Sequence, residues 1–440
     1  MRVMAVCVLW VLSVAVTAQE LRIEITKGND KPTVVAVVPF SDAPGAALPE
    51  NVSAIISADL YRSGLFRLIP ASDMLGLPHQ ESEVHYRDWR ALGTEYLAVG
   101  KMGRDANGMI LAKVELFDVY RQQKIFSQQW QAPVSDLRDM AHAISDRIYL
   151  ALTGVRGAFS TKILYVSALN MPNKRYNYRL MVADSDGARP KQILESSEPI
   201  LSPTWAPNGY EIAYVSFEYD RRPAIMRHNL RTGQRDKLTH FPGLNSAPAF
   251  SPDGRQLAMV LSKDGSPDIY IMDLSTRTLS RITKDNIAID TEPAWMPDGK
   301  SLVFTSNRGG APQIYRVVLA EGWTERMTFD GDYNARAVPL PDGSGIALVH
   351  RENGSFHIAV LEFATGRLKV LSHTSLASLD ESPTIAPNGS MLMYATENKG
   401  RGILAAVSVD GSVSFNLPGK DRDVRDPSWS PFLNPPQSSR

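Results

Sequence analysis

The chain repeats one short pattern six times between Pro203 and Pro427, at intervals near 45 residues. Each clear copy is a proline-led segment that ends in Asn-Gly or Asp-Gly: PTWAPNG (203–209), PAFSPDG (248–254), PAWMPDG (293–299) and PTIAPNG (383–389). A degenerate copy, AVPLPDG, lies at 337–343, and the copy PSWSP at 427–431 lacks the turn glycine. Asn-Gly and Asp-Gly favour tight turns between strands. Each copy therefore predicts a hairpin whose second strand follows the glycine.

Two unmatched strands at opposite ends of the repeats predict a closed ring. Lys162–Ser167 (KILYVS) looks like a second strand, but no proline-led strand precedes it, whereas the proline-led strand at Pro427 has no second strand after it. Third and fourth strands follow in each unit, as in Asp268–Leu274 and Thr278–Thr283. Four strands per repeat of this length indicate a propeller blade. Six blades would close if Asp426–Ser430 paired beside Lys162–Ser167, which an open solenoid would not explain.

A different pattern precedes the repeats and predicts a second domain. Strand-like runs such as Thr33–Phe40 and Tyr96–Met102 alternate with amphipathic helical patterns at Glu50–Arg62 and Leu137–Leu152, which favours a small α/β domain. The expected order is a signal peptide at 1–18, an α/β domain at 19–159, a six-bladed all-β propeller at 160–432 and a disordered tail at 433–440.

The N-terminus is typical of a secretory signal peptide. Arg2 precedes an apolar run from Val3 to Val16, and Val16-Thr17-Ala18 provides small residues for cleavage before Gln19. The run is shorter than the roughly 20 apolar residues of a membrane span. We expect a chain that is exported and not inserted in a membrane. The single cysteine, Cys7, lies inside this signal, so the mature chain would have neither disulfide nor thiolate chemistry.

The first mature segment, Gln19–Thr26, alternates like a strand and is followed by the flexible stretch Lys27–Lys31. We therefore expect residues 19–31 to be loosely tethered. The simpler interpretation is an edge strand of the front sheet. The functional alternative is a detachable segment that another protein adds as a strand.

No catalytic or metal-binding motif stands out. The sequence lacks Gly-x-Ser-x-Gly, His-Glu-x-x-His and a P-loop. Lys plus Arg and Asp plus Glu both number 47, and no basic stripe with aromatic residues favours nucleic-acid binding. Two acidic groups are candidate calcium sites, Asp184–Gly187 and Asp421 with Asp423 and Asp426. Neither has the spacing of a calcium loop, so a hairpin turn and a solvated charge run are the favoured interpretations. We expect no cofactor and no metal.

The order of strands in a blade predicts which mouth of the propeller binds a partner. The connections from strand two to three and from strand four to the next blade are the longer and more varied ones, and they share one mouth. The innermost ring of that mouth should come from residues just before each first strand: 201–202, 245–247, 290–292, 334–336, 380–382 and 424–426. Small and hydrogen-bonding residues around a channel mouth suit recognition of a protein surface.

Several stretches of the chain resemble the TolB family, the periplasmic components of the Tol-Pal system. They include Ala247–Gly254 (APAFSPDG), Thr291-Glu292-Pro293, Pro387-Asn388-Gly389 and Leu152-Thr153-Gly154. The resemblance runs from Glu20 to Phe432. It implies a non-enzymatic periplasmic adaptor that links the Pal lipoprotein at the outer membrane to TolA at the inner membrane, and that supports outer-membrane integrity and invagination during cell division. It also implies a monomer that contacts further envelope proteins.

The resemblance gives residue-level expectations for both partners. Ala247, Thr291 and Glu292 match the family at positions that face Pal, while Leu244 stands where the family often has histidine. The mouth adds further candidates for the Pal surface: Asn245, Arg336, Glu381 and Arg425. The candidates for TolA are the residues of the first mature segment: Gln19, Glu20, Leu21, Arg22, Ile23, Glu24 and Ile25.

The sequence leaves two other classes of function open. A propeller enzyme would use paired carboxylates, such as Glu292 with Asp380 or Glu381. A carbohydrate-binding module would use aromatic platforms, but the three candidate tryptophans recur at one position of the repeat: Trp205, Trp295 and Trp429. A recurring position indicates packing between blades rather than a platform.

Overall fold

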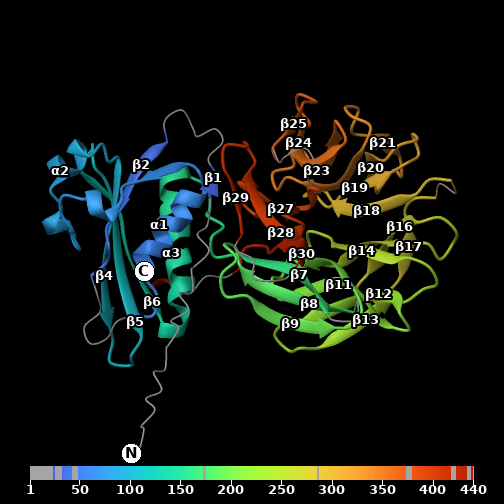
Figure 1. Cartoon of the computed structure of the whole chain (residues 1–440), viewed down its shortest axis with the longest axis horizontal. Helices are drawn as coiled ribbons and strands as arrows, with labels where there is room; N and C mark the ends of the chain where they lie inside the picture. Colours follow the sequence, from blue (N-terminus) through green and yellow to red (C-terminus); the bar gives the residue numbers. More distant parts are fainter. Residues whose placement is uncertain are drawn as a thin grey trace, which may run out of the picture.

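A computed structural model of the chain describes residues 23–24, 32–41, 48–171, 175–284, 287–372, 379–417, 423–433 and 438–439. The predicted signal peptide and Gln19–Arg22 lie outside these residues. Figure 1 shows two bodies, an α/β domain at residues 32–159 (the front domain) and a ring of sheets at residues 160–433 (the propeller). No helix in the described ranges is long and apolar enough to span a membrane.

The front domain is one mixed sheet with helices packed on it. Its strands follow the order β3-β2-β4-β5-β6, with β2 parallel to both neighbours and the rest antiparallel. The strands are β2 (Thr33–Val37), β3 (Phe66–Leu68), β4 (Tyr96–Arg104), β5 (Ile110–Asp118) and β6 (Gln123–Ala132). The helices are α1 (Val52–Arg62), α2 (Tyr86–Ala91) and α3 (Leu137–Thr153).

Alternation along the strands gives this sheet two buried faces. Val35 and Val37 of β2 pack with α1 and α3, whereas Val34 and Ala36 face the opposite core beside Trp89 of α2. The two long helices begin and end within two residues of the predicted bounds. Asn51 Oδ1 accepts the Ala54 N–H at the start of α1, and Gly154, at φ 77°, ends α3.

The propeller consists of six antiparallel sheets within the described ranges, each of four blade strands. Blade one combines β30 (Asp423–Trp429) with β7 (Lys162–Met171), β8 (Arg175–Asp184) and β9 (Lys191–Ser196). Blade two holds β10 (Ile200–Trp205), β11 (Glu211–Tyr219), β12 (Arg222–Asn229) and β13 (Arg235–Thr239). Blade three holds β14 (Asn245–Phe250), β15 (Gln256–Leu261), β16 (Asp268–Asp273) and β17 (Leu279–Arg281).

The second half of the ring repeats this arrangement. Blade four holds β18 (Asp290–Trp295), β19 (Ser301–Ser306), β20 (Gln313–Val318) and β21 (Thr324–Arg326). Blade five holds β22 (Asn334–Pro339), β23 (Gly345–Glu352), β24 (Ser355–Glu362) and β25 (Leu368–Val370). Blade six holds β26 (Glu381–Ile385), β27 (Met391–Asn398), β28 (Arg401–Ser408) and β29 (Ser414–Asn416).

The predicted closure of the ring is confirmed. β30 pairs antiparallel with β7, with Arg425 opposite Val166 and Trp429 opposite Ile163. Two hydrogen bonds extend this pairing: the Lys162 N–H donates to Ser430 Oγ at 2.9 Å, and Trp429 Nε1 donates to Thr161 Oγ1 at 2.7 Å. The last blade strand of the chain is thus the innermost strand of the first blade.

The tryptophans of the repeat pack between blades, as predicted. Trp205 and Trp295 are 8% and 7% exposed. The Nε1 of Trp205 donates to the Ser428 carbonyl at 3.2 Å, and that of Trp295 to the Ala249 carbonyl at 3.0 Å. Each carbonyl belongs to the inner strand of the preceding blade. These contacts join neighbouring blades and leave no aromatic platform at either position.

One expectation for the chain ends was wrong. β1 (Ile23–Glu24) pairs with β29 of the propeller, with Ile23 opposite Phe415, so it is not an edge strand of the front sheet. In the predicted tail, β31 (Ser438–Ser439) pairs with β6 of the front sheet, and residues 434–437 and 440 lie outside the described residues. Each end of the chain therefore adds a strand to the domain at the other end. Local sequence patterns do not encode such long-range pairings.

Removing residues 421–440 should open the ring, because it deletes β30. We expect the free energy of unfolding to fall by on the order of 5 kcal/mol or more, from the lost strand hydrogen bonds and the lost packing of Trp429. Urea denaturation followed by circular dichroism measures this. Removing only residues 434–440 keeps β30 and should cost about 1 kcal/mol. Equal stability of the two truncated chains would contradict the closure.

Candidate functional site

The inner strand of every blade carries a β-bulge at the same place. The pairing register shifts between Leu201 and Thr204 in blade two, for example, and at the equivalent point in the other five blades. One bulge residue per blade adopts φ between 47° and 55°, although none is glycine: Ser202, Ala247, Glu292, Arg336, Ser382 and Asp426. Such backbone costs about 1–3 kcal/mol per residue. A bulge re-aims a side chain, and these six residues line a cavity of about 230 Å³ on the propeller axis. We call them the ring.

Arg336 connects the ring across its cavity. Its Nη1 donates to Ser382 Oγ at 2.6 Å, and its Nη2 donates to Asp426 Oδ1 at 3.2 Å. Its Nε lies 3.5 Å from Glu292 Oε1 on the other side. One guanidinium therefore bridges three other blades, a geometry suited to its fixed fork of donors.

Further hydrogen bonds extend this network. Ser382 Oγ donates to Asp426 Oδ1 at 3.0 Å, and the Ser202 N–H donates to Asp426 Oδ2 at 3.2 Å. On the other side, the Arg336 N–H donates to Glu292 Oε2 at 3.0 Å. Five of the six ring positions are thus linked, and the methyl group of Ala247 contributes no polar contact.

The electrostatics of the ring favour its ionised state. Burial opposes the charge on Asp426, but the guanidinium of Arg336 and the hydrogen bonds to the carboxylate outweigh it and lower the pKa of Asp426. Burial also opposes the charge on Arg336, and the carboxylates of Asp426 and Glu292 outweigh it and raise the pKa of Arg336. The expectation that Asp426 belongs to a solvated charge run was wrong, because it is 8% exposed.

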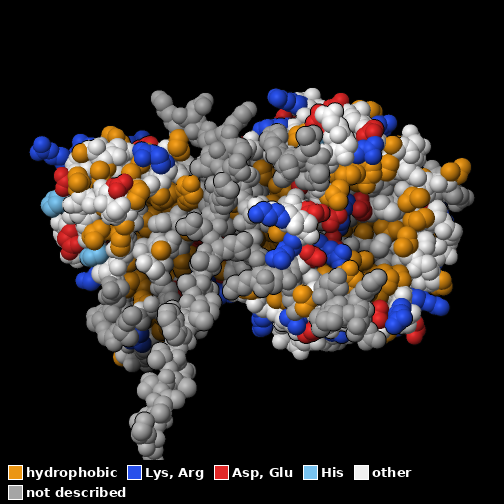
Figure 2. All heavy atoms as spheres, in the orientation of Figure 1, with side chains coloured by type: hydrophobic (Ala, Val, Ile, Leu, Met, Phe, Trp, Pro, Cys, Tyr) orange, Lys and Arg blue, Asp and Glu red, His pale blue; other side chains and the backbone are white. Residues whose placement is uncertain are grey.

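Exposed apolar side chains surround the ring. They lie on the connections that lead from strand four of one blade to strand one of the next: Leu244, Ile287, Ile289, Phe329 and Leu379. Ile287 is 93% exposed and Phe329 74%. We call this set the rim. Figure 2 shows charged side chains gathered at the centre of the propeller, with hydrophobic side chains on the blades around them.

Buried polar side chains brace the connections that carry the rim. Asn245 is fully buried, where its amide accepts the Phe241 N–H at 3.0 Å and donates to the Phe241 carbonyl at 2.7 Å. Asp290 is also fully buried and accepts from Arg308 Nη2 at 2.8 Å. The expectation that Asn245 faces a partner was therefore wrong, since its side chain shapes the loop from inside.

The other predicted mouth residues are accessible. Thr291 and Glu292 are partly exposed, Glu381 and Leu244 are exposed, and the guanidinium of Arg425 lies 5.6 Å from the ring centre of Tyr178. Sequence placed these residues before the first strands, whereas the structure places most of them inside the strands, which begin about three residues earlier. Which member of each triplet points inward depends on the bulge, and no local pattern revealed it.

Sequence reasoning named Leu244 but missed the other four residues of the apolar rim. Ile287 and Phe329 stand in connections, where a lone apolar residue is usually explained by packing. Their position in the repeat could have revealed them. Apolar residues precede the inner strand in several blades, and that connection lies on the mouth that the sequence already favoured for binding.

Comparison with known proteins gives concordant matches over both domains. Residues 21–125 match the model of the TolB amino-terminal domain, and residues 149–433 match the TolB beta propeller domain. The Tol-Pal system protein TolB of Alcanivorax borkumensis is 49% identical over 97% of this chain and 95% of the relative. That of Pseudomonas aeruginosa is 48% identical over 93% and 94%. The crystal structure of TolB from Acinetobacter baumannii superposes with a TM-score of 0.84, at 41% identity, over 94% of this chain and 100% of that one.

Replacing Arg336 with glutamine should destabilise the ring, since the carboxylates of Glu292 and Asp426 lose their shared cation. We expect the free energy of unfolding at pH 7 to fall by about 1–3 kcal/mol. Because the folded pKa of Asp426 lies below its ordinary value of 3.8, its contribution is present above that pH and is lost as pH falls. The difference between wild type and variant should therefore shrink in acid. Urea denaturation at pH 7 and well below pH 3.8 tests both points.

Arg255→Gln is the matched control for this change. Arg255 follows the turn glycine of blade three and its side chain is 85% exposed. Its loss should leave stability unchanged within about 0.5 kcal/mol. An equal cost for both arginines would contradict the role of Arg336 in the ring.

Proposed function

This chain belongs to the TolB family of Tol-Pal system proteins, and from that premise we propose that it is a non-enzymatic adaptor of the periplasm. In this proposal it links the Pal lipoprotein at the outer membrane to TolA at the inner membrane. It thereby supports outer-membrane integrity and the invagination of that membrane during cell division. The predicted signal peptide at residues 1–18 supports the location.

The observation that carries the Pal assignment is the combination of ring and rim on one mouth. Protein interfaces centre on exposed apolar and aromatic anchors with polar groups that fix orientation. Phe329 and Ile287 provide such anchors, and the ring provides fixed charges beside them. Leu244, Ala247, Thr291, Glu292, Glu381 and Arg425 remain the proposed Pal-facing residues, with Arg336 as their electrostatic centre.

The state of the carboxylates supports an adaptor over an enzyme. A paired-carboxylate mechanism needs groups that are free to hold or transfer a proton. Asp380 is fully buried and accepts from Thr396 Oγ1 at 2.6 Å, and Glu292 accepts from Thr305 Oγ1 at 2.8 Å and from the backbone of Arg336. Glu292 and Asp380 are thus engaged in holding the mouth together, so neither the pair of Glu292 with Asp380 nor that of Glu292 with Glu381 has two free carboxylates.

The pairing of β1 with β29 supports a role for the first mature segment in binding TolA. Ile23 and Glu24 form a short edge strand on blade six, and the rest of the proposed segment, residues 19–22 and 25, lies outside the described residues. A two-residue strand contributes few hydrogen bonds, so its release costs little. We propose that docked and free forms of this segment exchange, that TolA takes the free form, and that Pal at the mouth biases the exchange.

Phe329→Ala should weaken Pal binding by about fivefold or more, because truncating an exposed aromatic anchor typically costs over 1 kcal/mol. Trp323→Ala is the matched control. Trp323 is another exposed aromatic residue of blade four, but it precedes β21 in the turn on the opposite mouth. Isothermal titration of purified Pal into each variant measures the affinities. Equal effects of the two variants would contradict binding at the mouth.

Deleting residues 19–26 should abolish TolA binding and change the affinity for Pal. Linkage requires that any effect of Pal on TolA binding be returned as an equal effect of TolA on Pal binding. Titrations of each partner, alone and with the other at saturation, measure this factor. A chain with the same eight residues in scrambled order is the control. Unchanged affinity for both partners in the deleted chain would overturn the switch.

A further inference from the structure

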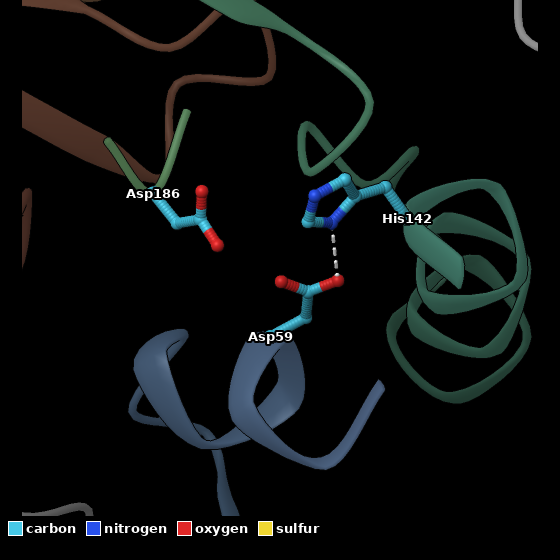
Figure 3. A group of neighbouring side chains, drawn as sticks. All are labelled: Asp59, His142 and Asp186. Carbon is cyan, nitrogen blue, oxygen red and sulfur yellow. Dashed lines mark hydrogen bonds and ion pairs between the residues drawn. The ribbon is translucent and has the colours of Figure 1, made fainter. Parts of the chain in front are cut away.

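A buried cluster of charged side chains joins the two domains. Asp59 of α1 and His142 of α3 belong to the front domain, and Asp184 and Asp186 lie at the turn between β8 and β9 of blade one. Asp59 is fully buried, and His142 and Asp184 are 1% and 2% exposed. In Figure 3 the side chains of Asp59, His142 and Asp186 converge from three separate elements.

His142 lies between a carboxylate of each domain. Its Nδ1 is 2.7 Å from Asp59 Oδ2, and its Nε2 is 3.8 Å from Asp184 Oδ2. Ser145 Oγ donates to the same Asp59 oxygen at 2.7 Å. Nδ1 is thus hydrogen-bonded to Asp59, whereas Nε2 is buried at ion-pair distance from Asp184 and has no hydrogen-bond partner among the described residues. A protonated imidazole is attracted to the carboxylates on both sides.

Cations of the front domain reach the carboxylates of the propeller. Arg138 Nε donates to Asp184 Oδ2 at 3.1 Å, and its Nη2 pairs with Asp186. Arg62 Nη2 pairs with Asp59 and lies 3.4 Å from Asp186 Oδ2. Asp186 therefore accepts from two guanidinium groups of the facing domain.

Cations of the propeller reach a carboxylate of the front domain in return. Lys162 Nζ lies 3.1 Å from Asp139 Oδ1 and 2.7 Å from Asp184 Oδ1. Arg189 Nη1 donates to Asp139 Oδ2 at 2.8 Å, and its Nε donates to Asp184 Oδ2 at 2.8 Å. The pairing is thus reciprocal, which fixes one domain against the other at several points.

Charged groups of both domains surround His142. The carboxylates of the cluster are Asp59, Asp139, Asp184 and Asp186, with the partly exposed Glu50 at 3.8 Å from Arg138 and Asp146 one turn further along α3. The permanent cations are Arg62, Arg138, Lys162 and Arg189. Carboxylates outnumber the permanent cations around His142, which favours its protonated form.

A metal ion is the competing interpretation, because oxygen and nitrogen atoms of Asp59, His142 and Asp186 lie within 4.8 Å of one another. Arg62 and Arg138 already provide the positive charge between these carboxylates. A divalent ion would have to enter beside two guanidinium groups, and at these distances in a buried site such repulsion is severe.

We propose that this cluster is an ion-paired clasp that holds the propeller against the front domain, with His142 as a cation shared by one carboxylate of each domain. The clasp goes beyond the proposed adaptor role and does not depend on either partner. It sets the orientation of the front domain relative to the propeller, whose sixth blade β1 extends.

The titration of His142 agrees with this geometry. Burial alone would lower its pKa, but the carboxylates of Asp59, Asp184 and Asp186 outweigh burial and raise the pKa to about 10. A folded pKa above the ordinary value of 6.5 means that the contribution to stability is complete below pH 6.5 and is lost as pH rises towards 10.

The test compares wild type with His142→Gln in urea denaturation between pH 7.5 and 9. Relative to the variant, the unfolding equilibrium constant of the wild type should rise about tenfold per pH unit, because unfolding releases one proton. His228→Gln is the matched control, since His228 is buried in the propeller and burial lowers its pKa. The control should keep the slope of the wild type.

A second measurement needs no variant. In the wild type, the ring nitrogens of His142, assigned by backbone-to-ring correlations in NMR, should stay protonated up to at least pH 8.5. Titration of His142 near pH 6.5 would overturn the proposal. So would stabilisation by zinc ions that is present in wild type and absent in His142→Gln, since that result would assign the cluster to a metal.

Discussion

When β30 pairs with β7, the last blade strand of the chain becomes the inner strand of the first blade, and every blade then has two neighbours. The same strand brings Asp426 into the ring, where it meets Ser202, Ser382 and Arg336 from three other blades. Closure and the charged centre of the mouth therefore depend on one segment. Without it, the guanidinium of Arg336 would lose the carboxylate to which it donates a hydrogen bond, and the ring of blades that carries the rim would be open.

The mouth contains strained backbone whose free-energy cost is offset by packing and hydrogen bonds. Six residues that are not glycine hold a left-handed backbone, five of them directly before proline, where the helical regions are further disfavoured. The interactions that offset this cost are the inter-blade packing and the network around Arg336. Side chains that point into the cavity are held by their neighbours before any partner arrives. Binding to such a surface loses little conformational entropy.

Much of the fold could be predicted from the sequence, because the repeat is local and regular. The turn glycines, the unmatched strand at Lys162 and the helical pattern of α3 each specify structure within a few residues. The site was less predictable. Asn245 was expected at the surface, yet its side chain turns inward and braces its loop. Asp184 and Asp186 were attributed to a simple turn, although they pair with arginines far away in the sequence. Such contacts depend on how separate elements pack against one another, and the neighbouring residues in the sequence do not indicate them.

Each end of the chain pairs with the sheet of the other domain: β1 extends the sheet of blade six, and β31 extends the front sheet. If the gene were divided at the linker near Phe159, the N-terminal half would keep β1 without its partner β29, and the C-terminal half would keep β31 without its partner β6. Both halves would expose a strand edge that is covered in the intact chain, at β29 and at β6. Such edges invite self-association, so poor solubility of an isolated half would reflect the cut and not a defect of its own fold.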